Sequence, residues 1–103
     1  MMMKRNGYTP LHRASYNGHK DLAEVLIDKG ADVNGKSKVG WTPLHHASYN
    51  GHTDVAEVLI VKGANINTDV KDNYGYTPLH HASDKGHTDL AEVLIDKGAD
   101  VNT

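Results

Sequence analysis

The sequence contains no cysteine and no phenylalanine, and it has three prolines and one tryptophan in 103 residues. Without cysteine the chain has no disulfide, no thiolate nucleophile and no sulfur ligand for a metal, which is typical of a reducing compartment. The longest uninterrupted apolar run, Val58–Val61, is far shorter than the roughly 20 residues that cross a bilayer. We therefore expect an intracellular protein, cytoplasmic or nuclear, with no membrane partner.

Charge is nearly balanced. The chain has 11 basic and 13 acidic side chains and a formal net charge of −2. No run of lysine or arginine supplies the positive field that gathers a phosphate backbone, so nucleic acid is not an expected partner. The length and the 38% hydrophobic content suit one small domain, which we expect to span residues 1–103.

The chain repeats itself three times. Residues 7–34, 40–67 and 75–102 align without gaps, and the first and third copies are identical at 24 of 28 positions. The third copy is preceded by two extra residues, which fall within 68–72. Such internal similarity predicts supersecondary units stacked side by side, each covering the apolar face of the next.

Each copy predicts two short helices. In the first copy, Thr9 is a hydroxyl N-cap directly before Pro10, whose fixed φ suits the first helical position. Gly18 and Gly30 then stand where two helices end, and residues 21–29 carry a wide apolar stripe at helical spacing. Helices of this length are marginal alone, so we expect the copies to stack into an all-α solenoid.

Two motifs give the chain a family resemblance. Gly-x-Thr-Pro-Leu-His and Ala-Ser-x-x-Gly-His occur at 7–12, 40–45 and 75–80 and at 14–19, 47–52 and 82–87, respectively. In these residues each copy resembles an ankyrin repeat. The resemblance implies three stacked antiparallel helix pairs with projecting β-hairpin fingers. It also implies binding of other proteins, with no catalytic residue and no cofactor.

Six of the eight histidines recur in two slots, which are His12, His45 and His80, and then His19, His52 and His87. A catalytic or metal site is a unique constellation, so this recurrence indicates a structural role and no dedicated metal site. The family resemblance implies that the first set bonds to the nearby threonine and backbone. The same resemblance places the second set at the turn between the helices.

The other two histidines, His46 and His81, occupy a slot that holds Arg13 in the first copy. We expect their side chains to be half-exposed and to face a groove. With no third carboxylate or histidine nearby, they would bind a metal only weakly. Protonation of the pair near ~6.5 should lower stability as the pH falls, because like charges depress the folded-state pKa.

The aromatic residues point to a function. All six lie in the finger and first-helix slots, where tyrosine and tryptophan offer rigid area and a polar tip to a partner. Three of them, each one residue before a Thr-Pro pair, have the alternative of packing along the finger stems. The predicted protein-binding residues are Tyr8, Arg13, Tyr16, Asn17, Lys38, Val39, Trp41, His46, Tyr49, Asn50, Asn73, Tyr74, Tyr76, His81, Asp84 and Lys85.

Two interpretations of the function stay open. The mixed but mainly basic surface around the aromatic residues favours a module that binds a protein with a modestly acidic, partly apolar patch. The near identity of the copies, and the lack of a polar capping copy, favour a consensus-like, engineered or excerpted scaffold. Such a scaffold would have no ligand of its own and would self-associate through its apolar ends.

Overall fold

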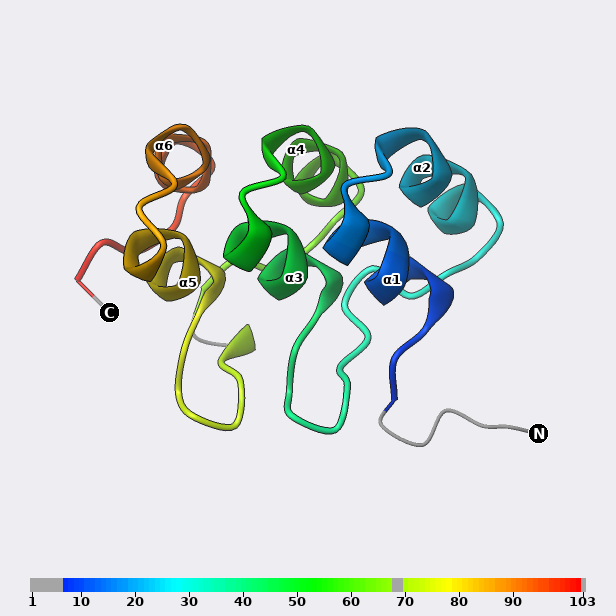
Figure 1. Ribbon diagram of the computed structural model, residues 1–103, viewed down its shortest axis with the longest axis horizontal. Helices are drawn as coiled ribbons and strands as arrows, with labels where there is room; N and C mark the ends of the chain where they lie inside the picture. Colours follow the sequence, from blue (N-terminus) through cyan, green and yellow to red (C-terminus); the bar gives the residue numbers. More distant parts are fainter. Residues whose placement is uncertain (1–6, 68–69, 103) are drawn as a thin grey trace.

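The computed structural model describes residues 7–67 and 70–102, which contain helices and turns but no strand. The helices are α1 (Pro10–Asn17), α2 (Lys20–Asp28), α3 (Pro43–Asn50), α4 (Thr53–Val61), α5 (Pro78–Asp84) and α6 (Thr88–Asp96). Figure 1 shows them in two rows, with α1, α3 and α5 in one and α2, α4 and α6 in the other. Each predicted copy supplies one pair, which confirms the all-α solenoid. No helix in these ranges has the length and apolarity needed to span a membrane.

The first helices begin where the Thr-Pro pairs predict. Thr42 has extended backbone, and its hydroxyl accepts from the backbone N–H of His45 at 3.4 Å. In return, Nδ1 of His45 accepts from the backbone N–H of Thr42 at 3.0 Å, which closes a capping box. The same boxes form at Thr9 and Thr77. Local chemistry alone therefore fixes the start of each first helix.

The core lies between the two rows. Leu44 and Ala47 of α3 and Leu59 of α4 are completely buried, because the middle pair has a neighbour on each side. The end pairs lack one neighbour. Leu22 of α2 is 48% exposed, whereas Val55, its counterpart in α4, is 1% exposed.

At the other end, the apolar residues Ile95 and Val101 are exposed, at 43% and 60%. Their counterparts in the middle copy, Ile60 and Ile66, are partly covered. The expectation of apolar surface at both ends of the described array is confirmed.

The fingers that project from the first row are tight turns. In one of them the backbone N–H of Ser37 donates to the carbonyl of Trp41 at 2.9 Å, and in the other Asp72 and Tyr76 make the same bond. Each finger reverses within five residues, so only one bond between backbone groups joins these paired residues, and no β-strand forms in the described part. The two-residue insertion expected within 68–72 lies partly outside the described residues.

The recurring histidines join successive copies. With Nδ1 of His45 accepting from Thr42, the proton is on Nε2, which donates to the carbonyl of Tyr76 in the next finger at 3.1 Å. Nε2 of His87 lies 3.1 Å from the carbonyl of Tyr49, at the end of the preceding first helix. These bonds confirm a structural role for both repeated slots.

The glycine at the end of α3 offers a test of this stacking. Gly51 and Gly86 both have positive φ, of 73° and 71°, so alanine is strained at either position by about 1–2 kcal/mol. A Cβ on Gly51 would lie 2.7 Å from the His87 ring, whereas one on Gly86 meets nothing within 4 Å. We expect Gly51→Ala to lower the urea midpoint more than Gly86→Ala, because His87 must give up its bond to Tyr49. Equal losses would contradict this role of His87.

Candidate functional site

The predicted binding residues lie on α1, α3, α5 and the fingers, along one side of the array (Figure 1). Eleven of the sixteen are exposed, and Tyr8, Trp41 and Asn50 are half-buried. The most open aromatic rings are those of Tyr74 and Tyr16, at 78% and 53% exposure. The exposed members are Arg13, Tyr16, Asn17, Lys38, Val39, Tyr49, Asn73, Tyr74, Tyr76, Asp84 and Lys85.

The other two members, His46 and His81, are buried, each with 6% exposure. The expectation that they are half-exposed in a groove is wrong. The physical reason is the indole of Trp41, whose centroid lies 4.8 Å from the His46 ring and 4.7 Å from the His81 ring. Trp41 fills the space between the two imidazoles and covers both.

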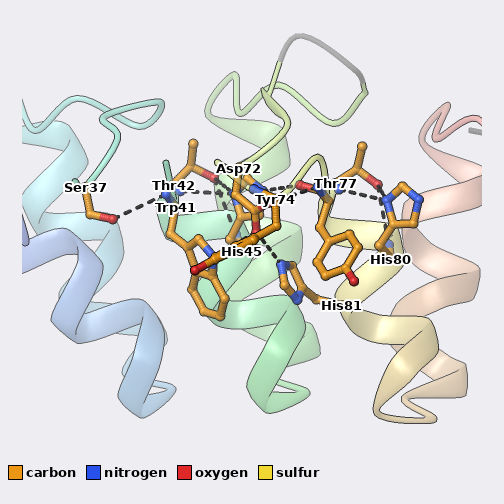
Figure 2. Close-up of polar contacts among 10 residues, drawn as sticks. Ser37, Trp41, Thr42, His45, Asp72, Tyr74, Thr77, His80 and His81 are labelled. Atoms are coloured by element: carbon orange, nitrogen blue, oxygen red, sulfur yellow. Dashed lines mark hydrogen bonds and ion pairs between the residues drawn. The ribbon is translucent and has the colours of Figure 1, made fainter. Parts of the chain in front are cut away.

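A carboxylate that the sequence reasoning missed lies at the centre of this cluster. Nε2 of His81 and Nε1 of Trp41 both lie 2.9 Å from Oδ2 of Asp72, as Figure 2 shows for His81. The other oxygen, Oδ1, accepts from the backbone N–H groups of Tyr74 and Tyr76, at 2.9 Å each. Asp72 is 5% exposed and uses both oxygens.

The hydrogen bonds keep Asp72 ionised in spite of its burial. Burial by itself raises the pKa of this carboxyl, but the donors from Tyr76, His81 and Tyr74 together lower the pKa below its usual value. One signal in the sequence could have pointed to this residue. Asp72 stands nine positions before His81, and the residue nine positions before His46 is Ser37, so the copies differ at a site beside the histidine slot.

The equivalent network is missing around His46. Oγ of Ser37 accepts from the backbone N–H of Trp41 at 3.3 Å, as Asp72 does from Tyr76, but it supplies no carboxylate. Both ring nitrogens of His46 are buried and have no hydrogen-bond partner among the described residues. Instead, rings surround it edge-on, including those of Tyr8 and Tyr16 at 5.3 and 5.9 Å between centroids.

This environment keeps His46 neutral. Burial lowers its pKa to about 4, and repulsion from His12, His45 and His81 adds to the shift. The direction of this pKa shift agrees with the expectation from like charges, but burial is the larger cause. Burial also lowers the pKa of His45 to about 4, against the opposing effect of its bond to Tyr76.

Three possible metal ligands come together at the second interface. The donor atoms of His45, Asp72 and His81 lie within 4.8 Å of one another. The expectation that no carboxylate lies near the histidine pair is therefore wrong. Nε2 of His45 already bonds to Tyr76, however, and Nε2 of His81 to Asp72. In the described arrangement these groups form a hydrogen-bond network.

Several predicted binding residues also hold this surface together. Nδ2 of Asn73 donates to the carbonyl of Lys38 at 2.9 Å and so joins the two fingers. Nδ2 of Asn50 donates to the carbonyl of Tyr16 at 3.2 Å. Nζ of Lys85 lies 4.5 Å from the centroid of the Tyr49 ring, within cation–π range. Hydrogen bonds between neighbouring copies thus fix the backbone that carries the exposed rings.

Charge separates between the two rows. The second helices carry eight carboxylates, which are Asp21, Glu24, Asp28, Asp54, Glu57, Asp89, Glu92 and Asp96. The first helices carry one, Asp84. Exposed basic side chains lie along the first row and its fingers, at Arg13, Lys36, Lys38, Lys71 and Lys85. Four more, Lys20, Lys29, Lys62 and Lys97, lie in or directly after the second helices and offset only half of the eight carboxylates there. The aromatic side of the molecule is therefore the basic side.

Comparison with known families agrees with this architecture. A family model described as ankyrin repeats, in three copies, matches residues 35–103, and one described as an ankyrin repeat matches residues 6–38. The chain belongs to the ankyrin repeat family. Ankyrin repeats generally bind other proteins and are generally non-catalytic.

Individual relatives match over about one ankyrin repeat. Ankyrin repeat domain-containing protein 49 of Bos taurus is 67% identical over 27 residues, which is 26% of this chain and 11% of that protein. Ankyrin repeat-containing protein P1E11.10 of Schizosaccharomyces pombe is 52% identical over 29 residues, or 28% of this chain and 14% of that protein. The match to serine/threonine-protein kinase TNNI3K of Mus musculus covers 4% of that kinase. The matched segment is thus a small fraction of each relative.

The buried histidines make stability depend on pH. His45 and His46 titrate near 4 in the folded chain and near ~6.5 when unfolded, so the unfolded chain binds more protons between these values. Their contribution to stability is complete above about pH 6.5 and is lost as the pH falls toward 4, by up to about 3 kcal/mol for each histidine. Urea midpoints measured from pH 7.5 to 4.5 should fall accordingly, and a flat profile would contradict the neutral state.

A single substitution tests the cause of this pH dependence. Ser37→Asp places a carboxylate in the position that Asp72 occupies beside His81. We expect the pKa of His46, followed by NMR, to rise from about 4, and the loss of stability in acid to become smaller. The matched control is Val39→Asp, which adds the same charge to an exposed position of the same finger. An equal rise in both variants would show a general charge effect instead of a specific pair.

Proposed function

We propose that this ankyrin repeat chain binds an acidic, partly apolar surface of another protein through its first helices and fingers. The observation that carries the proposal is the coincidence of exposed aromatic rings and basic side chains on one side of the array. The eight carboxylates of the second helices lie in the other row. A partner with an acidic patch is attracted to the first row and repelled from the second.

The aromatic residues supply the apolar part of this interface. Tyr16 and Tyr74 are exposed by 53% and 78%, and Tyr49, whose ring also contacts Trp41 and Lys85, keeps 37% of its surface exposed to a partner. Tyrosine has few rotatable bonds, so it gives large contact area at a small entropic cost. The bond from Asn73 to Lys38 and the bond from Asn50 to Tyr16 reduce that cost further, because they fix the backbone below the rings.

Absence of catalysis belongs to the same proposal. His45 caps α3 and bonds to the next finger, and His81 bonds to Asp72. These hydrogen bonds give both histidines a structural role. We propose that the chain needs no cofactor, binds no nucleic acid or membrane and works inside the cell.

The binding side can be tested with one purified partner and two matched variants. Photo-crosslinking from position 49 in cell extract supplies candidate partners, each of which is then produced and its affinity measured by calorimetry. We expect Tyr49→Ala to weaken binding by about 1–2 kcal/mol, as loss of an interface aromatic does. Val61→Ala is the control, because Val61 is 75% exposed on α4 in the other row. A partner that depends on Val61 and ignores Tyr49 would refute the proposed side.

Association of the chain with itself is a second candidate function. It is favoured by the exposed apolar side chains at the two ends of the described array. These are Leu22 and Val25 on α2 at one end, and Ile95 on α6 and Val101 after it at the other. If the ends pair, sedimentation velocity over a concentration series should show dimers or longer arrays, and Leu22→Lys should shift the population to monomer. Monomers across the whole range would rule this function out and leave the ends as solvated surface.

A further inference from the structure

A pocket of 240 Å³ lies where the first copy meets the second. Its lining comes from the start of the chain and from α1 and α3, through Tyr8, His12, Arg13, Tyr16, Asn17 and His46. Sites for small molecules usually have volumes of about 300–1,000 Å³. The volume of this pocket therefore suits a single side chain of a partner.

The walls of the pocket are aromatic. The rings of Tyr8 and Tyr16 meet the His46 imidazole edge-on, and the ring of Tyr8 lies 5.8 Å from that of His12. His46 is only 6% exposed, and neither of its ring nitrogens has a hydrogen-bond partner among the described residues. Such a lining offers ring faces and ring edges, which favour an aromatic guest over an aliphatic one.

The rim of the pocket is positive. Arg13 is exposed and forms no ion pair with any residue the structure describes. Its carbonyl holds the side-chain amide of Asn17 at 3.0 Å, which fixes that neighbour at the edge. No carboxylate is among the lining residues. A guanidinium that is free to form a forked pair with a carboxylate selects an acidic group.

The equivalent slots at the next interface hold different side chains. There, Trp41 stands in the slot of Tyr8, and its indole contacts Tyr49 at 5.3 Å as well as His46 and His81. The slot of Arg13 is held by His46, which is buried. Two differences between near-identical copies, a smaller ring and an exposed cation, therefore accompany the pocket.

We propose that this pocket is an anchoring site for an aromatic side chain of the partner that stands next to a carboxylate. The ring enters between Tyr8 and Tyr16, and the carboxylate pairs with Arg13. This inference rests on the proposed function and adds the kind of residue that is recognised.

The probe is 3-phenylpropionate, which carries a ring and a carboxylate, titrated into the whole chain while the His46 and Tyr8 ring signals are followed by NMR. Propionate and phenethylammonium are the comparison ligands. We expect 3-phenylpropionate to shift both signals with a dissociation constant on the order of millimolar, and either comparison ligand to bind at least about tenfold more weakly. Equal binding of phenethylammonium would overturn the assignment of the charge.

Two variants locate the probe. Arg13→Gln should weaken 3-phenylpropionate binding about tenfold, whereas Lys97→Gln, an equal loss of charge at an exposed position after α6 in the other row, should leave it unchanged. Tyr8→Trp places at the first interface the larger ring that Trp41 supplies at the second, so it should fill the pocket and abolish the shift of the His46 signal, with circular dichroism confirming the fold. Binding that survives both Arg13→Gln and Tyr8→Trp would refute the pocket. In that case, a partner that still depends on Tyr49 would leave the proposed function standing.

Discussion

A neutral imidazole at the start of α3 joins three parts of the structure, which are the helix, its own threonine cap and the next finger. In the middle copy, Nδ1 of His45 accepts from Thr42 and caps the helix, while Nε2 donates to Tyr76 in the next finger. The capping bond exists only while the ring is uncharged, because a protonated Nδ1 cannot accept from Thr42, whereas Nε2 can donate to Tyr76 in either charge state. Because helices of eight or nine residues are marginal alone, this link between local capping and stacking is what makes each copy part of an array. Burial, which lowers the pKa of the ring, keeps it in the required state.

Near-identical copies nevertheless produce two chemically different interfaces. At the second one, Asp72 receives a hydrogen bond from Trp41 and pairs with His81, and its other oxygen accepts from two backbone N–H groups. At the first, Ser37 provides no carboxylate, and His46 is left with aromatic rings alone. A single finger residue thus separates a satisfied polar network from an unsatisfied one, which is costly to bury. The pocket lined by Tyr8, Arg13 and Tyr16 lies at this less satisfied interface.

The division between repeated and variable residues carries over to function. Repeated residues form the caps, the core and the bonds between copies, so their substitution changes stability first. The variable residues include Arg13, Tyr74 and Lys85, which are exposed on the row that carries the basic side chains. Ankyrin repeats generally bind proteins, and in this chain a rigid array lets a few exposed rings and cations form a surface at little entropic cost.

Helix starts, helix ends and the structural role of the repeated histidines could be predicted from the amino-acid order, because each depends on groups within a few residues, as Thr42 and His45 show. The burial of His46 and His81, the partnership with Asp72 and the pocket beside Arg13 could not. Each of these needs contact between different copies, such as that of Trp41 with Asp72, 31 positions apart. The local sequence pattern determines which face of a helix is apolar. Which polar groups are buried between the helices is decided only when the copies pack against one another.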